Sequence, residues 1–479
     1  MTPEEAALAR RPANAPAPSS EGSLDPEVVE EIRAGYRMVE ADRLRHNAVT
    51  NNAIDDLALN RQALSQVDDH FSHRIRSRGV TNQKKSGRCW MFAALNVIRP
   101  QVIRDHGMEE FEFSVAFLQF WDRMERANLF LESVIDLRDI DYLERDWELL
   151  NRWGMEDGGW WNYLAALVEK YGVVPSSVMP ETHGSSNTAT MNLVLQRLIR
   201  TYSAKLLNRH ADGGTMAELR AIKSEALAEV YRFLVINLGE PPTEFEWRYR
   251  RTTKPDRSDP EAEMRTVTDP ALGESESFTP KSFRKRYVGC AMSDFVCLYN
   301  DPKNELNRHY RFDRARNMVD SENMGFVNVD MDVIRQASIR SIKANEPLWF
   351  AVNMGYDQSR ELGIMQDKLL DYEALFGIDL TLSKADRARF HSDVSNHAMA
   401  LMGVDLDSEG RPKKWLVENS WGKEQGDEGF WSLHDDWFDE HVYTVIVHRR
   451  HVPDEVLAYF EETPTVLPAW YPGAAGVLA

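Results

Sequence analysis

The sequence predicts an α+β fold, with helices mostly in the first half of the chain and strands in the second. Between residues 190 and 250, MNLVLQRLIRTYSAKLL and MAELRAIKSEALAEVYRFLVINLG have the apolar spacing of helices. Later in the chain, the short apolar runs PLWFAVNMG, HAMALMGVDL and KKWLVENS are typical of strands. Separate runs of helices and strands indicate an α+β architecture.

The segments can be placed in order along the chain. An Ala-, Pro- and Ser-rich stretch at the N-terminus is predicted to be disordered. Asp25 and Pro26 suit the N-cap and first position of a helix that continues to about residue 54, and the next helix covers 88–99 and ends near Pro100. The predicted segments are a disordered tail at 1–24, a helical segment at 25–75, a helical lobe at 76–190, a mostly helical and loop insertion at 191–340, a β-rich lobe at 341–455, and a C-terminal arm at 456–479.

The composition is that of an ordinary folded protein with a strongly acidic charge balance. Hydrophobic residues make up 43% of the 479 residues, and the formal net charge is −19. No apolar run is long enough to cross a bilayer, and the N-terminus lacks the apolar core of a secretion signal. Three cysteines are too few for a disulfide framework, which favours a reducing cytoplasm. The negative charge argues against nucleic acid as the main partner, although SFRKRY could form a local basic patch.

Cys89 lies where a polar turn meets an apolar run, in TNQKKSGRCWMFAALNVIRP. Gly87 permits a sharp turn, which puts Cys89 near a helix N-terminus, where free N–H groups stabilise a thiolate. A lone cysteine is more often a small core residue, so partners must decide its role. Gln83, in the turn before it, could donate a side-chain N–H to an oxyanion beside the Cys89 backbone N–H.

The best candidate for a base among the 13 histidines is His397, in VSNHAMALMGVDLDSEGRPKKWLVENSWG. This stretch reads as a β-hairpin, and a turn centred on Ser408 places His397 directly opposite Asn419. Directly paired residues have Cβ atoms about 4.5–5.5 Å apart, so the Asn oxygen could orient the imidazole. With Cys89 and Gln83, the set points to acyl transfer through a thiol nucleophile.

These residues resemble the papain-like cysteine peptidases, and the closer resemblance is to the bleomycin hydrolase/aminopeptidase C family. VTNQKKSGRCWMFAALNVIR, DGGWWNYLAALVEKYGVVP, NHAMALMGV, WLVENSWG and the ending VLPAWYPGAAGVLA are similar to segments of that family, in the same order. The resemblance runs from about residue 30 to the C-terminus. It implies a two-lobed papain-like fold with an inserted helical domain.

Two departures from the general papain pattern stand out. Ser86 and Arg88 replace the second cysteine and the small residue that precede the nucleophile in secreted relatives. Cys89 and His397 are 308 residues apart, against roughly 130–150 in simple papain-like enzymes, so about 160 residues are inserted. The helical block near 190–250 and the polar loop after it are the candidates for this insertion, and they resemble the extra helical domain through which the family assembles.

The resemblance implies a role for each site residue. Cys89 is expected to be the nucleophile, His397 the base and then the acid, Asn419 the orienting residue, and Gln83 an oxyanion donor. The resemblance also implies that Trp421 shields the His–Asn bond, and that Gly158 and Gly159 bind the substrate backbone. Each of these last three could equally have a plain structural role. No cofactor or metal is expected, since the sequence contains neither HExxH nor a CxxC pair.

The C-terminal arm bears on the kind of peptidase. In the family, the tail enters the active-site cleft and presents its carboxylate, here that of Ala479, to the substrate's α-ammonium. This implies a cytoplasmic thiol aminopeptidase that acts on peptides with a free N-terminus, assembles as a homohexamer and needs no membrane. Bleomycin-type amide hydrolysis is compatible with this activity. The alternatives are a broad endopeptidase, an acyltransferase with the same triad, or a nucleic-acid-binding protein.

Overall fold

The structure is a computed structural model that describes residues 22–65, 67–77, 79–252, 272–392 and 394–474. The chain divides into two compact units. One consists of Met1–Leu59 and Asp371–Asp379, and the other of Asn60–Leu370 and Leu380–Ala479. Most of the predicted N-terminal tail, and Ala479 itself, lie outside the described residues.

The first unit is made of short helices. They are α2 (Pro26–Gly35), α3 (Glu40–Val49), α4 (Ile54–Ala58) and α15 (Tyr372–Phe376). Asp25 caps α2 as predicted, because its side chain accepts from the Val28 N–H and Pro26 occupies the first turn. The single helix expected up to residue 54 is instead broken, since Tyr36 leaves the helical conformation and ends α2.

The second unit contains the longer helices and, in the described part of the chain, a 12-stranded sheet. Its α-helices are α5 (Arg61–Leu64), α6 (Cys89–His106), α7 (Val115–Asp136), α8 (Arg145–Trp153), α9 (Trp161–Tyr171), α10 (His183–Ser186), α11 (Thr188–Ala211), α12 (Met216–Leu238), α13 (Pro280–Tyr287), α14 (Met331–Lys343), α16 (Lys384–Arg389), α17 (Asp435–His441) and α18 (Asp454–Tyr459).

The main sheet runs in the order β14-β5-β6-β4-β13-β7-β10-β11-β12-β9-β8, and β1 pairs with β10. Its strands are β1 (His73–Arg74), β4 (Phe295–Tyr299), β5 (Arg308–Phe312), β6 (Gly325–Asn328), β7 (Leu348–Val352), β8 (Gln358–Ser359), β9 (Ile364–Met365), β10 (His397–Leu406), β11 (Pro412–Glu418), β12 (Phe430–His434), β13 (Val442–His448) and β14 (Thr465–Leu467). A separate pair is formed by β2 (Phe245–Trp247) and β3 (Glu276–Phe278). Residues 295–328, within the predicted mostly helical insertion at 191–340, therefore belong to the main sheet.

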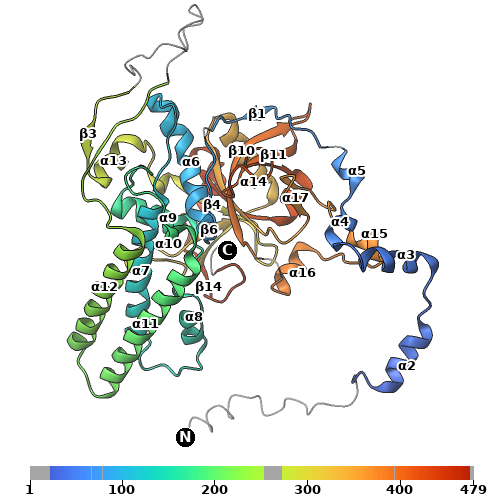
Figure 1. Cartoon of the computed structure of the whole chain (residues 1–479), viewed down its shortest axis with the longest axis horizontal. Coiled ribbons are helices and arrows are strands. Elements are labelled where there is room, and N and C mark those ends of the chain that lie inside the picture. The colour runs from blue at the N-terminus through green and yellow to red at the C-terminus, as the bar shows by residue number, and fades with distance from the viewer. Residues whose placement is uncertain (1–21, 66, 78, 253–271, 393, 475–479) are drawn as a thin grey trace, which may run out of the picture. The chain divides into compact units, whose positions relative to one another are not determined.

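Helix α6 is the centre of this unit. Every residue from Cys89 to Pro100 is buried, as expected from a run that is apolar nearly all round. The helix packs on β10 and β7 on one side and on α7 and α9 on the other, and Figure 1 shows it between the helices and the sheet. The Trp349 indole of β7 donates to the Trp90 carbonyl at 3.2 Å.

The predicted end of this helix at Pro100 is wrong. The helix continues through Pro100 to His106 and stops at Gly107, which adopts the left-handed conformation with φ +60°. A proline removes one backbone hydrogen bond from a helix, and the tertiary packing around α6 offsets that loss here.

The β10–β11 hairpin is present, but its register differs from the prediction. Pairing centres on Glu409 rather than Ser408, and register shifts interrupt the ladder. His397 pairs with Val352 of β7, and Asn419 lies just beyond the end of β11. The predicted direct pairing of His397 with Asn419 is therefore wrong, because the turn is displaced and the bulges change the count.

A buried ion pair ties α6 to the strand that precedes Asn419. Arg99 donates to Glu418 at 2.5 Å, and their side chains are 2% and 0% exposed. Arg99 Nη2 also donates to the Ser77 hydroxyl and the Gly79 carbonyl. Arg99 Nε and Glu418 Oε2 are buried without a hydrogen-bond partner among the described residues. Removing one partner of a buried pair leaves the other charge without compensation.

We expect Glu418→Gln to lower the free energy of unfolding by about 3 kcal/mol, because it leaves Arg99 charged and buried. Arg308→Ala, which removes an exposed ion pair with Glu305, is the control and should change it by less than about 1 kcal/mol. Urea denaturation followed by tryptophan fluorescence measures both. Equal losses for the two variants would contradict the role assigned to the buried pair.

Candidate active site

Cys89 is the first residue of α6 and is completely buried. Burial raises the pKa of its thiol to about 12, although the backbone N–H groups of Ala398, Trp90 and Cys89 itself lower it. The Asp157 carboxylate adds to the rise in this pKa. The cysteine is therefore a neutral thiol at neutral pH and needs a base to become a nucleophile.

His397 is the first residue of β10, and its Nε2 lies 2.8 Å from Oδ1 of Asn419. Asn419 Oδ1 also accepts the Ser420 N–H at 2.8 Å, which fixes the carboxamide. Burial lowers the pKa of His397 to about 4, the Asn419 bond opposes this, and Arg360 lowers it further. The imidazole is therefore neutral, and with Nε2–H donated to Asn419 its Nδ1 is left with a free lone pair.

The main chain brings the cysteine and the histidine together. One of the N–H groups that reach the Cys89 sulfur belongs to Ala398, the residue directly after His397. Among the described residues, no hydrogen bond joins the sulfur to the imidazole itself. Such catalytic contacts are often long without substrate and tighten when substrate binds. The Cys89 sulfur is thus bonded to the peptide group that follows His397.

Gln83 is held at both ends of its carboxamide. Its Oε1 accepts from the Ser420 hydroxyl at 2.6 Å, and its Nε2 donates to the Ser86 carbonyl at 2.7 Å. The Gln83 N–H also donates to the Ser420 carbonyl at 2.8 Å. Because Nε2 carries two hydrogens, one remains for an oxyanion beside the N–H of Cys89.

Trp421 lies against the imidazole. The ring centroids of Trp421 and His397 are 4.6 Å apart with an interplanar angle of 33°, and the Arg360 guanidinium lies 4.8 Å from the centre of the indole ring. Trp431 packs against the indole edge-on at 5.4 Å. The indole thus covers the ring that Asn419 orients, and it brings a cation close to that ring.

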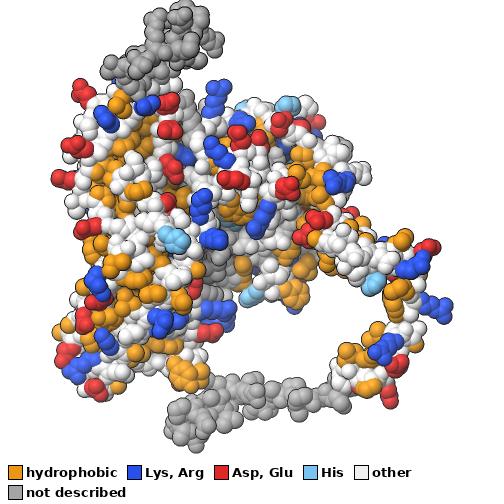
Figure 2. Space-filling model, in the orientation of Figure 1, with side chains coloured by type: hydrophobic (Ala, Val, Ile, Leu, Met, Phe, Trp, Pro, Cys, Tyr) orange, Lys and Arg blue, Asp and Glu red, His pale blue; other side chains and the backbone are white. Residues whose placement is uncertain are grey.

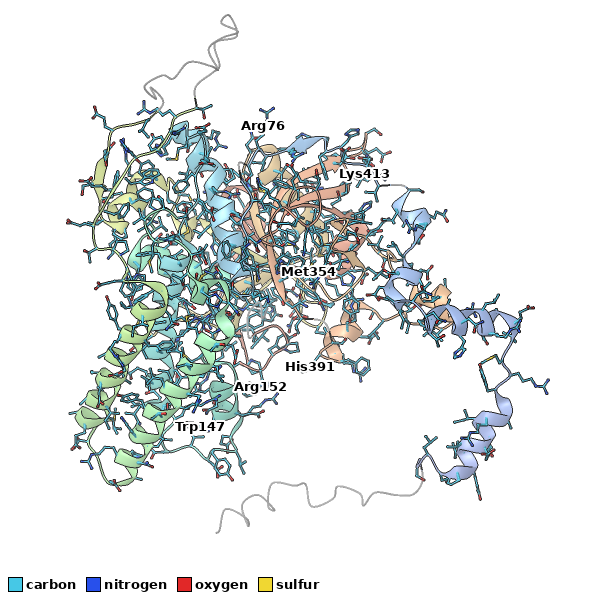
Figure 3. The ribbon with its side chains drawn as sticks, viewed as in Figure 1. Arg76, Trp147, Arg152, Met354, His391 and Lys413 are labelled. Carbon is cyan, nitrogen blue, oxygen red and sulfur yellow. The ribbon has the colours of Figure 1, made fainter. Side chains whose placement is uncertain are left out.

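A cleft of about 1080 Å³ opens between the helices and the sheet, and the buried Cys89 is not among its described lining residues. Gln83, His397 and Trp421 line it, and so do the cations Lys85, Arg152 and Arg360. Figure 2 shows basic side chains gathered where the helical part meets the sheet. Figure 3 labels two lining residues, Arg152 from α8 and Met354 from the turn that follows β7. The two sides of the cleft therefore come from distant parts of the chain.

The two glycines expected to bind a substrate backbone are both buried. The Gly158 N–H donates to the Gly87 carbonyl at 3.0 Å, and the Gly158 carbonyl accepts from Arg126. Both polar groups of Gly158 are thus already used inside the protein. A Cβ at Gly159 would come within 2.8 Å of the Trp90 ring, so this glycine permits close packing behind the nucleophile.

Sequence reasoning missed several residues around the site. Asp157 accepts the Gly87 N–H at 3.0 Å and pairs with Arg123. Burial opposes ionisation of Asp157, but Arg123 and hydrogen bonds lower its pKa to about 2. Asp157 directly precedes Gly158 and Gly159 in the sequence, and this position could have marked it as a site residue. Glu181, which pairs with Arg88, has no such signal because it lies 93 residues away.

The described residues contain no group of three or more His, Cys, Asp or Glu side chains placed to hold a metal ion. Within the same residues, none of the helices combines the length and apolar character needed to cross a bilayer. Ala479 lies outside the described part of the chain. The described arm ends at Ala474, which is buried.

Comparisons with known proteins extend over nearly the whole chain. The model of a family described as Peptidase C1-like matches residues 23–474. Aminopeptidase C of Streptococcus thermophilus is 36% identical over 452 residues, which cover 94% of this chain and 98% of that protein. Bleomycin hydrolase of Rattus norvegicus is 36% identical over 450 residues, which cover 90% and 94%. The crystal structure of PepW from Lactobacillus rhamnosis HN001 matches with a TM-score of 0.88 and 34% identity, over 95% of this chain and 99% of that one.

These matches confirm two predictions made from the sequence. One is the resemblance to the bleomycin hydrolase and aminopeptidase C proteins, and the other is the papain-like α+β fold. From its sequence and from its fold, the chain belongs to the Peptidase C1-like family.

Proposed function

We propose that this protein is a thiol aminopeptidase that removes N-terminal residues from peptides through a cysteine acyl-enzyme. The observation that carries the proposal is the 2.8 Å bond between His397 and Asn419, beside a cysteine at the start of a buried helix. Relatives named aminopeptidase C and bleomycin hydrolase support it. By the same likeness, related amides are candidate substrates.

In the proposed mechanism, the Cys89 sulfur attacks the carbonyl carbon of the first residue while its proton moves to Nδ1 of His397. The resulting oxyanion accepts from the free Nε2 hydrogen of Gln83 and from the Cys89 N–H. The imidazolium then protonates the leaving amine, and the C–N bond breaks. Water attacks the thioester with His397 as base, which releases the amino acid and restores the thiol.

Asn419 acts in this scheme by holding the imidazole in one orientation. Its Oδ1 accepts from Nε2, so the ring keeps Nδ1 available for the thiol proton. Trp421 covers this hydrogen bond and limits competition from water. The buried surroundings strengthen each of these polar contacts, because the local dielectric is low.

We also propose that the C-terminal carboxylate of Ala479 recognises the substrate's free amine. Ala474 and Gly154 line one cavity, and residues 152 and 156–157 line the cleft. Ala479 is five positions after Ala474, and a stretch of that length reaches at most about 18 Å. The described arm therefore ends near the helical edge of the cleft.

Of the two glycines expected to bind the substrate backbone, only Gly159 is kept in this proposal. A homohexamer and a cytoplasmic location remain predictions from the family resemblance.

Replacing the nucleophile tests the reaction itself. We expect Cys89→Ala to abolish release of amine from unblocked amino-acid amides, with a loss of at least about 10⁴-fold in kcat, because no acyl-enzyme can form. The wild type should hydrolyse unblocked amides and leave their N-acetylated forms intact. Full activity in Cys89→Ala would remove the mechanism. Equal turnover of acetylated substrates would favour the endopeptidase alternative.

The last residue tests the recognition of the free amine. Deleting Ala479 moves the carboxylate by one residue, so we expect kcat/KM for unblocked amides to fall by at least about tenfold, as a partly desolvated ion pair is lost. Ala479→Gly keeps the carboxylate in place and should retain activity. An unchanged ratio of unblocked to acetylated turnover in the deletion variant would rule out this role for the terminal carboxylate.

The pH dependence tests the buried imidazole. Burial disfavours the imidazolium, so His397 stays a competent base until the pH falls to about 4, and kcat/KM should hold well below pH 6.5. Since Arg360 lowers this pKa, Arg360→Ala should move the acid limb to higher pH. The exposed Arg389 is the control, and Arg389→Ala should leave the limb in place. A shift to lower pH in Arg360→Ala would contradict the assignment.

A further inference from the structure

The residue before Cys89 is a buried arginine, Arg88. The Arg88 side chain is 1% exposed, and it lies at the N-cap of α6 without capping the helix. Its Nη1 and Nη2 each donate to an oxygen of Glu181, at 3.0 Å and 2.7 Å. Nη1 also donates to Oε1 of Gln119 at 3.1 Å. A bidentate pair of this kind fixes both the position and the plane of the guanidinium.

The remaining donor of Arg88 points back into the turn that carries Gln83. Its Nε donates to the Ser86 hydroxyl at 2.9 Å, and that hydroxyl donates to the Gln83 carbonyl at 2.6 Å. Gln83 Nε2 in turn donates to the Ser86 carbonyl. A chain of hydrogen bonds therefore runs from Glu181 through Arg88 and the Ser86 hydroxyl to the main-chain carbonyl of Gln83. The Gln83 carboxamide, which would face the oxyanion, is held separately by the main-chain carbonyl of the same Ser86.

We infer that Arg88, clamped by Glu181, is a positioning residue for the oxyanion hole. It acts on both proposed donors, because it holds the Gln83 turn through Ser86 and its own peptide bond supplies the N–H of Cys89. This inference rests on the proposed acyl-transfer function.

The inference makes a prediction that a purely structural role does not. Arg88→Met keeps the volume and removes the donors, and Glu181, which is 35% exposed, can turn to water. We expect kcat for an unblocked amide to fall by at least about tenfold with little change in KM, because only the transition state uses the hole. Alkylation of Cys89 by iodoacetamide develops no oxyanion, so its rate should stay within about threefold of wild type.

A second comparison asks whether Arg88 acts through Gln83. Gln83→Ala should show the same split between hydrolysis and alkylation, and Arg88→Met combined with Gln83→Ala should be no slower than Gln83→Ala alone. Ser86→Ala removes the hydroxyl that lies between Arg88 and the Gln83 carbonyl, and it should behave like Arg88→Met. It therefore tests the inference independently if Arg88→Met folds poorly. Arg335→Met, which breaks half-buried ion pairs with Asp435 and Asp439 on the β-rich side, is the control and should leave both rates unchanged.

Three outcomes would overturn the inference. They are unchanged hydrolysis in both Arg88→Met and Ser86→Ala, equal loss of hydrolysis and alkylation in these two variants, and a double variant much slower than Gln83→Ala. A different set of results would contradict the proposed function itself. In that case wild type does not hydrolyse unblocked amides, or Cys89→Ala retains the activity.

Discussion

The site depends on one constraint, the burial of α6 against β10 and β7. A helix that is apolar nearly all round must be enclosed, and the helical lobe on one side and the sheet on the other enclose it. That packing brings the first residue of α6 to the first residues of β10. Cys89 therefore meets the Ala398 N–H, and His397 is carried to the same place.

Burial also favours the uncharged forms of Cys89 and His397. It raises the pKa of Cys89 to about 12 and lowers that of His397 to about 4, so both side chains are neutral before substrate arrives. The same low dielectric that disfavours the charged pair strengthens any donor aimed at a developing oxyanion.

Three buried arginines, in α6 or next to it, connect distant segments of the chain through ion pairs. Arg88 pairs with Glu181 at the start of α6, Arg99 with Glu418 further along, and Arg123 of α7 with Asp157 beside the nucleophile turn. Each acid comes from a segment distant in sequence from its arginine. Since buried ion pairs tolerate little displacement, these contacts set how the helices and strands around the cleft are spaced.

The sequence by itself determined the residue types and the local elements. The apolar run after Cys89, the capping of α2 by Asp25 and the strands around His397 follow from periodicity and propensity, which are local properties. The segments similar to the bleomycin hydrolase family also pointed to Gln83 and Asn419 before any geometry was available. Only the tertiary structure decided that α6 continues through Pro100 and that the hairpin turns around Glu409. It also decided that Asn419 bonds to His397 from a position just beyond the end of β11. The reason is physical: packing can override a local helix stop, a bulge shifts register without a clear sequence mark, and pairs such as Arg88 with Glu181 exist only once distant segments meet.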